Sequence, residues 1–183
     1  MNSFVYDIPT KVYFGPGQLH HLGPELAAYG KRVLLCYGGG SIKKSGLYDR
    51  VAAQVKEAGL ELFELSGIDP NPRVSSVNSG AAICKKEHID VVLAVGGGSV
   101  IDCAKFVAAG AYYDGDAWDF LTGKAKVGKC LPLISVLTLA ATGSEMDGTS
   151  VISNPDTQEK LVNADYAMRP RVSFLDPTET YSV

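Results

Sequence analysis

The stretch AVGGGSVIDCAK, residues 94–105, joins an apolar run to a helical pattern through three consecutive glycines. Residues 91–95 are all apolar, which is typical of a strand covered on both faces of a sheet. The residues after the glycines predict a helix that ends near Tyr112. Because glycine lacks a Cβ and tolerates positive φ, we infer that this turn lets another group approach the backbone closely.

The same strand–turn–helix unit recurs along the chain at intervals of about 30 residues. Residues 32–37, 60–65 and 133–137 predict strands, and residues 41–58 and 73–88 predict helices. We therefore predict an α/β fold of the Rossmann-like type, with an open, mostly parallel sheet, right-handed crossovers and helices on both faces. Residues 1–183 are interpreted as one dinucleotide-binding domain.

Three further segments complete the predicted fold. Residues 172–177 predict a last core strand, and the NPDT turn at residues 154–157 predicts an antiparallel hairpin. Alternating apolar and polar residues over 3–14 predict an N-terminal β-hairpin that turns near Pro9. Residues 17–29 are weakly helical in pattern, with Gly23 and Pro24 interrupting them.

The composition narrows the class of protein. A chain of 183 residues with 46% hydrophobic residues and a net charge of −3 fits one globular domain without a nucleic-acid or anionic-membrane surface. Neither a membrane-spanning run nor a signal-peptide pattern is present, so we expect a cytoplasmic protein. The four cysteines lack a CxxC spacing and are interpreted as buried free thiols of a reducing compartment: Cys36, Cys84, Cys103 and Cys130.

The glycine turn at residues 96–99 predicts a phosphate or pyrophosphate site. Backbone N–H groups there can point into one concavity, and the following helix adds the positive end of its dipole. The predicted residues are Gly96, Gly97, Gly98 and Ser99. Asp102 has two interpretations: a cap of the helix, or a contact to a hydroxyl or amide of the ligand. Lys105 is interpreted as a solvated helix residue.

A second glycine turn predicts the adenosine end of a nucleotide site. It consists of Gly38, Gly39, Gly40 and Ser41. No acid follows it before Asp49, whereas Lys43 and Lys44 do, so charge favours the 2′-phosphate of NADP over NAD. The alternative is a surface turn with two solvated lysines.

A third cluster lies in TLAATGSE, residues 138–145. Thr138, Thr142 and Ser144 supply hydroxyl groups at the end of a predicted strand, where the nicotinamide half of a cofactor could lie. Thr142 and Glu145 also have the spacing of a capping box, so helix capping is the alternative.

Five stretches in this order resemble the iron-containing, or group III, alcohol dehydrogenases, nearest to the NADPH-dependent butanol dehydrogenases: YDIPTKVYFGPG, DPNP, AVGGGSVIDCAK, ATGSEMDGTSVIS and FLDP. The resemblance implies a dinucleotide-binding domain that precedes an all-helical metal-binding domain. It implies that residues 96–99 hold the pyrophosphate, that the 138–144 hydroxyls line the cofactor, and that Asn71 and Lys160 border it. It also implies that residues 38–41 form the NADP-binding turn.

The chain departs from the family pattern at two positions and lacks the metal ligands. Family members commonly have proline at Ala140 and asparagine at Asp147. The family's Fe²⁺ or Zn²⁺ is held by one aspartate and three histidines of the helical domain. The histidines here are His20, His21 and His88, which are interpreted as surface or capping residues, so we expect no metal bound by this chain and no turnover by it alone.

The resemblance predicts the cofactor-binding half of an NAD(P)H-dependent alcohol dehydrogenase or aldehyde reductase. We also expect homo-oligomers, through the apolar face that the helical domain would cover or through edge pairing of the N-terminal hairpin. Hydride would pass between NADPH, or NADH, and a small aldehyde or alcohol. Two alternatives stay open: the nucleotide half of a dehydroquinate synthase-like lyase, and a stand-alone, non-catalytic NADP-binding module.

Overall fold

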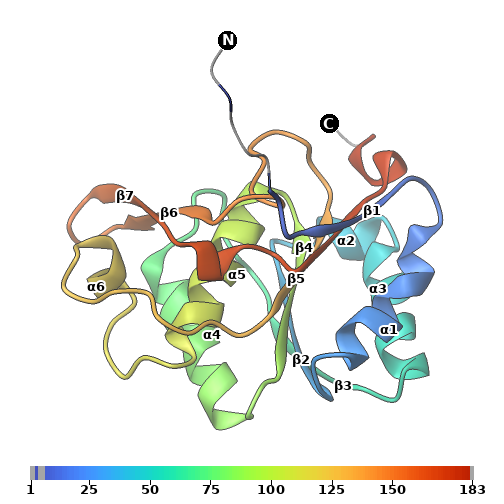
Figure 1. Ribbon diagram of the computed structural model, residues 1–183, viewed down its shortest axis with the longest axis horizontal. Helices are drawn as coiled ribbons and strands as arrows, with labels where there is room; N and C mark the ends of the chain where they lie inside the picture. The colour runs from blue at the N-terminus through green and yellow to red at the C-terminus, as the bar shows by residue number, and fades with distance from the viewer. Residues whose placement is uncertain (1–2, 4–6, 182–183) are drawn as a thin grey trace.

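The structure, a computed structural model, describes residue 3 and residues 7–181. Its centre is a parallel sheet in the order β1-β8-β5-β4-β2-β3 (Figure 1). The strands are β1 (Lys11–Phe14), β2 (Arg32–Tyr37), β3 (Glu61–Leu65), β4 (Val91–Gly96), β5 (Leu133–Leu137) and β8 (Val172–Leu175). The predicted open, mostly parallel α/β sheet is confirmed.

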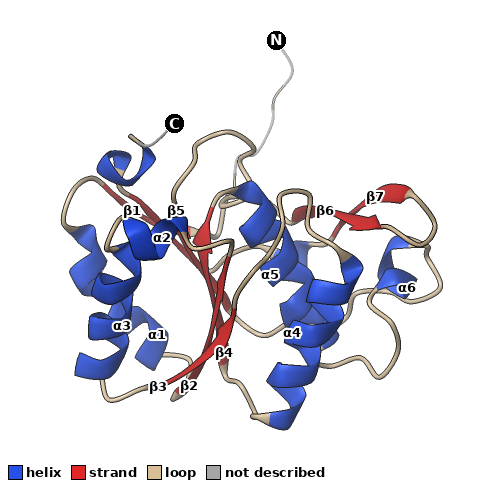
Figure 2. Cartoon of the chain, turned by 180° about the vertical axis from the view of Figure 1, so that it is seen from behind, coloured by secondary structure: helices blue, strands red, loops and turns tan. Residues whose placement is uncertain are grey.

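Helices cover both faces of this sheet (Figure 2). On one face lie α1 (Leu22–Ala27), α2 (Ser41–Lys44) and α3 (Leu47–Glu57), and on the other α4 (Val74–Lys86) and α5 (Gly98–Gly110). Successive residues of β2 serve opposite faces, since Val33 packs with the α1–α3 side and Leu34 with the α4–α5 side. Both faces are therefore buried, which explains the apolar runs in the sequence.

Two predicted helical segments are subdivided in the structure. The 41–58 segment consists of α2 and α3, because Gly46 between them has φ +77° and interrupts the helix. Residues 17–29 contain a 3₁₀ helix at Gln18–His21 followed by α1. A short helix, α6 (Trp118–Leu121), was not predicted, and further 3₁₀ turns lie at Tyr166–Met168 and Pro177–Thr180. Among the described residues, none of the helices is long and apolar enough to cross a bilayer.

The N-terminal strand joins the main sheet at its edge. β1 pairs in parallel with β8, with Lys11 opposite Val172. The Thr10 hydroxyl donates to Pro170 O at 2.7 Å, and Lys11 N donates to Arg171 O at 2.9 Å, so these contacts lead the chain onto β8. The first arm of the predicted N-terminal hairpin falls mainly on residues 4–6, outside the described residues, and residues 7–10 form no strand.

The predicted antiparallel hairpin is confirmed. β6 (Thr149–Asn154) and β7 (Glu159–Ala164) pair with Asn154 opposite Glu159, around the NPDT turn. The hairpin lies beside α5 and α6, away from the main sheet, as Figure 1 shows. The hairpin therefore packs against α5, the helix that follows the central glycine turn.

The cysteines generate a prediction about reactivity. Burial raises the pKa of the Cys84, Cys103 and Cys130 thiols to about 12, and Cys36 is also buried with a raised pKa. Because the thiolate is the nucleophile, the native protein at pH 8 should react slowly with a disulfide reagent, half-buried Cys130 first. Unfolding in guanidinium should expose all four thiols to rapid reaction. Rapid modification of several thiols before unfolding would contradict this packing.

Candidate functional site

The carboxyl ends of the parallel strands place three turns on one edge of the sheet. The turns follow β2, β4 and β5, and β4 lies between the other two strands. In open α/β sheets this edge is where ligands bind. The three turns that were predicted to bind a nucleotide therefore lie side by side on this edge, with the AVGGGS turn in the middle.

The central turn leaves the start of α5 bare. Gly97 is the N-cap residue, with φ −82°, and no side chain caps the helix. The first N–H groups of a helix have no acceptor within the helix, and the dipole places partial positive charge there. These donors can therefore receive an anion, and α5 spans 13 residues, enough for a substantial dipole.

Gly98 is required for a close approach rather than for an unusual backbone angle. Gly96, Gly97 and Gly98 all lack positive φ in the structure. A Cβ at Gly98 would lie 2.9 Å from Thr142 Cγ2 and closer still to Thr142 Oγ1. The missing side chain thus lets the 138–144 segment close against the first turn of α5, so two of the predicted clusters touch.

Asn71, Ser99 and Lys160 come from three distant segments and meet beside the central turn. Asn71 has φ +57°, and its N–H donates to Ser99 Oγ at 3.3 Å. Lys160 Nζ donates to Asn71 Oδ1 at 2.6 Å. The structure therefore brings together these residues, which were predicted to border the cofactor, although their contact with a cofactor stays a prediction.

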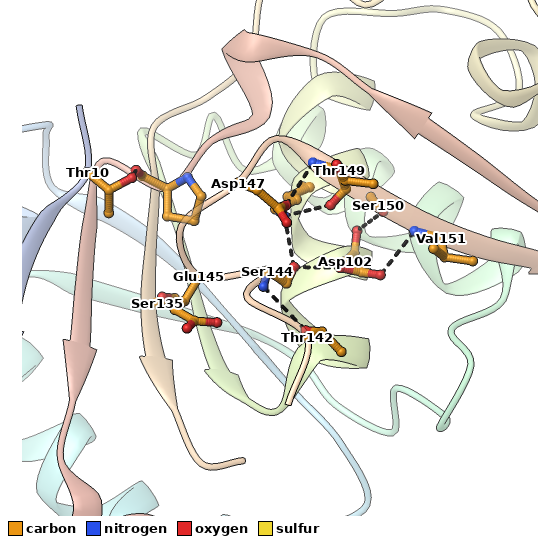
Figure 3. A network of polar contacts seen from close by, with 12 residues as sticks. Thr10, Asp102, Ser135, Thr142, Ser144, Glu145, Asp147, Thr149, Ser150 and Val151 are labelled. Carbon is orange, nitrogen blue, oxygen red and sulfur yellow. Dashed lines mark hydrogen bonds and ion pairs between the residues drawn. The ribbon is translucent and has the colours of Figure 1, made fainter. Parts of the chain in front are cut away.

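Asp102 fastens α5 to the following loop and the hairpin, and it does not cap the helix. Its carboxylate accepts a hydrogen bond from Ser144 Oγ at 2.6 Å and another from Val151 N at 3.0 Å (Figure 3). Burial raises the pKa of Asp102, although both hydrogen bonds and nearby Lys105 oppose that shift. The capping interpretation of Asp102 is wrong, because the acceptor oxygens are used by tertiary partners.

Lys105 is buried, so its interpretation as a solvated residue is also wrong. Its side chain is 0% exposed. The ammonium donates to Ser144 Oγ at 2.8 Å, to Asp147 Oδ1 at 2.9 Å and to Thr149 O at 2.6 Å. Burial lowers the pKa of Lys105, and the hydrogen bond and charge of Asp147 oppose this shift. A signal was present in the sequence, since Lys105 is flanked by the apolar residues Cys103, Ala104, Phe106 and Val107.

The 138–145 segment is a loop, so the capping-box interpretation of Thr142 and Glu145 is wrong. No helix begins there, and Thr142 Oγ1 instead accepts from Ser144 N at 3.3 Å. Glu145 is 9% exposed, and within the described part of the chain its Oε2 is buried without a hydrogen-bond partner. The loop is held by Asp102 and Lys105 from the side of α5.

The turn after β2 opens into a pocket of about 720 Å³. Ser41 from this turn and Thr138, which directly follows β5, both line it, so residues of two predicted clusters face one pocket. Gly40, with φ +107°, leads from the turn into α2. Lys44 and Arg50 add positive charge to the lining, and Arg50 is paired with Glu179 at 2.6 Å.

The two lysines of α2 have different surroundings. Lys43 Nζ lies 3.9 Å from a Glu64 oxygen and over the rings of Tyr37 and Tyr48, whereas Lys44 lines the pocket. Both tyrosine hydroxyls donate to Glu64. Burial acts to raise the pKa of Glu64, but these hydrogen bonds and Lys43 outweigh it and keep the pKa below its usual value. An acid does therefore lie near this turn, supplied by β3.

The residues present do not fit the metal of the resembled family. Among the described residues, no group of three histidine, cysteine, aspartate or glutamate side chains is placed to hold a metal ion. His20 and His21 are adjacent, with ring centroids 3.8 Å apart, and His20 Nδ1 hydrogen-bonds Gly17 O. The three turns on the carboxyl edge of the sheet instead present backbone amides, hydroxyl groups and lysines.

The chain matches a known protein family over most of its length. The family model of the iron-containing alcohol dehydrogenases matches residues 9–177. NADH-dependent butanol dehydrogenase A of Clostridium acetobutylicum is 55% identical over 183 residues, which is 100% of this chain and 47% of the relative. A crystal structure of NADH-dependent butanol dehydrogenase A from Thermotoga maritima matches with a TM-score of 0.96 and 47% identity, over 100% of this chain and 46% of that one.

A more distant relative has the other coenzyme in its name. The NADPH-dependent aldehyde reductase YqhD of Escherichia coli is 38% identical over 186 residues, which is 100% of this chain and 47% of the relative. The chain thus spans about half the length of the relatives it matches. The resemblance to the iron-containing alcohol dehydrogenases, and to their butanol dehydrogenases, is confirmed. The NADPH dependence of that subgroup is not, because the matched butanol dehydrogenases are named as NADH-dependent.

The contact between Gly98 and Thr142 generates a prediction about stability. Replacing Gly98 with alanine should lower the free energy of unfolding by about 1–3 kcal/mol, because the new methyl group needs the space of Thr142. Gly39→Ala is the control, since no heavy atom lies within 4 Å of a Cβ added there. Urea unfolding measures both variants, and a Gly98→Ala protein as stable as the parent would contradict the contact.

Proposed function

Because the chain belongs to the iron-containing alcohol dehydrogenase family, we propose that it is the nucleotide-binding half of an NAD(P)H-dependent alcohol dehydrogenase or aldehyde reductase. One observation carries the proposal: the uncapped start of α5 lies between two polar turns on the carboxyl edge of the sheet. Family membership favours this function over a dehydroquinate synthase-like lyase. It also favours this function over a stand-alone, non-catalytic NADP-binding module.

The order of the turns suggests how a dinucleotide is bound. The pyrophosphate would lie against the amides of Gly97, Gly98 and Ser99, where the helix dipole favours negative charge. The adenosine would occupy the pocket lined by Ser41 and Thr138. The nicotinamide would then extend toward the loop that carries Thr142 and Ser144, with Asn71 and Lys160 bordering the path.

When bound, the nucleotide supplies hydride exchange with a small aldehyde or alcohol. The residues described here bind and orient it: amides hold the phosphates, hydroxyls line the two ends, and Asp102 fixes the loop beside it. The described residues offer no set of ligands for a carbonyl-polarising metal. We therefore expect nucleotide binding from this chain and no turnover by it alone.

Charge at the adenosine pocket supports NADPH as the preferred coenzyme. Lys43 is partly neutralised by Glu64, and Arg50 by Glu179. Among the described residues no ion pair is found for Lys44, which lines the pocket together with Ser41. An ammonium and a hydroxyl suit a 2′-phosphate, so Lys44 is the residue on which the preference should depend.

The first test concerns the central turn. Gly97→Val should weaken the binding of NADPH and NADH about tenfold or more, because a branched side chain would fill the approach to the amides. The nearest contact of a Cβ there is Leu139 Cβ at 3.2 Å, and that side chain is 39% exposed, so it can move and the domain should still fold. Calorimetric titration measures affinity, and circular dichroism checks the fold.

Gly128→Val is the matched control for this test, since a Cβ added at Gly128 meets nothing within 4 Å and the loop lies outside the proposed site. It should bind both nucleotides like the parent. Undiminished binding by a folded Gly97→Val protein would refute the pyrophosphate site.

The second test compares two adjacent lysines. Lys44→Met should weaken NADPH binding about fivefold while leaving NADH binding nearly unchanged, because only NADPH carries the 2′-phosphate. Lys43→Met should have a smaller effect on this ratio, since Lys43 faces Glu64 rather than the pocket. Titrations at low and moderate salt measure the two affinities, and a larger effect at low salt is expected. Equal losses for both nucleotides in Lys44→Met would contradict the assignment.

A further inference from the structure

We propose that Lys105 is a positioning residue for the nicotinamide end of the bound nucleotide. Its buried ammonium holds the 142–149 segment against the first turns of α5 through Ser144, Asp147 and Thr149. This inference rests on the proposed function. It assigns a role to a residue that would not contact the nucleotide directly but would act through the loop that does.

Burying the ammonium group of Lys105 lowers stability, so its presence calls for a role beyond packing. An ammonium loses its water shell on burial, and apolar side chains of similar size often stabilise such positions better. The neighbours of Lys105 along α5 are apolar and buried, including Ala104 and Phe106. A methionine would fit this environment for packing alone, so packing does not explain a lysine with three hydrogen bonds to one loop and the strand after it.

The contacts of Lys105 connect directly to predicted cofactor residues. Ser144 Oγ accepts from Lys105 and donates to Asp102, so one hydroxyl joins both charged groups of α5 (Figure 3 shows Ser144 beside Asp102). Ser144 N donates to Thr142 Oγ1, and Thr142 lies against Gly98. A chain of contacts therefore runs from Lys105 to the bare helix start, and it fixes how far the loop stands from that start.

Lys105 also balances the negative charge that gathers on this side of the site. Asp102, Glu145 and Asp147 all act on it electrostatically. The Asp147 side chain is 43% exposed whereas Lys105 is fully buried, so the pair reaches from the interior to the surface of the loop. Without the ammonium, these carboxylates would repel one another, and the loop should move away from α5.

The test uses probe pairs that differ in the nicotinamide: NADPH with 2′-phospho-ADP-ribose, and NADH with ADP-ribose. Lys105→Met should weaken the binding of the complete nucleotides about tenfold, because the loop beside the nicotinamide loses its anchor. The binding of the shortened probes should change less than about twofold, because the pyrophosphate turn and the adenosine pocket keep their own contacts. If Lys105 had a purely structural role, its replacement would change the affinities for the complete and the shortened nucleotides equally.

Two further variants complete the experiment. Lys85→Met is the matched control, since Lys85 also bridges two segments, through Tyr113 O and Asp114, but lies outside the proposed site. It should leave the affinity ratio of each probe pair unchanged. Asp147→Ala removes one of the three Lys105 contacts, together with the hydrogen bond from Thr149 N, at a partly exposed position. It should give about a threefold selective loss, which decides the question if Lys105→Met does not fold.

The outcomes separate this inference from the proposed function. If the parent chain binds none of the four probes, the proposed function fails. If the parent binds them but the folded lysine variant loses complete and shortened probes equally, or loses neither, Lys105 has no positioning role. The same conclusion follows from an unchanged ratio in Asp147→Ala when that is the only variant that folds.

Discussion

The proposed nucleotide site depends on keeping the start of α5 free of side chains. A helix start whose amides are capped internally offers nothing to an anion, and a side chain at Gly98 would drive away the neighbouring loop. Three glycines meet both requirements at once. The buried strand β4 then holds this turn in the middle of the sheet, between the ends of β2 and β5, so the central donor group has a polar wall on each side.

The wall on the β5 side is an irregular loop that owes its position to charged groups. Asp102 and Lys105 lie three residues apart on α5 and fasten the same loop and the start of the hairpin. Buried charges are costly unless they are fully satisfied, and here each charged group has several partners. Specific hydrogen bonds replace regular secondary structure as the means of fixing the backbone at this point.

On the β2 side, ion pairs formed in the folded protein neutralise part of the positive charge near the pocket. Three cationic side chains, Lys43, Lys44 and Arg50, lie close together in the sequence around α2 and α3. Partners from β3 and from the last turn partly neutralise Lys43 and Arg50. Of the two cationic side chains that line the pocket, Arg50 is paired with Glu179, which lines it too, whereas no ion pair is found for Lys44 among the described residues.

The sequence by itself determined the central elements of the fold. Mainly apolar runs identified β2, β4 and β5, the NPDT turn identified the hairpin, and the ordered motifs identified the family. These features are local, or they survive as a fixed order of short stretches. Only the tertiary structure decided that β1 pairs in parallel with β8, that Lys105 is buried, and that Glu64 engages Lys43. Each of these depends on a partner distant along the chain, such as Thr149 for Lys105, and hydrophobic periodicity reports the face of a helix or strand but not what packs against it.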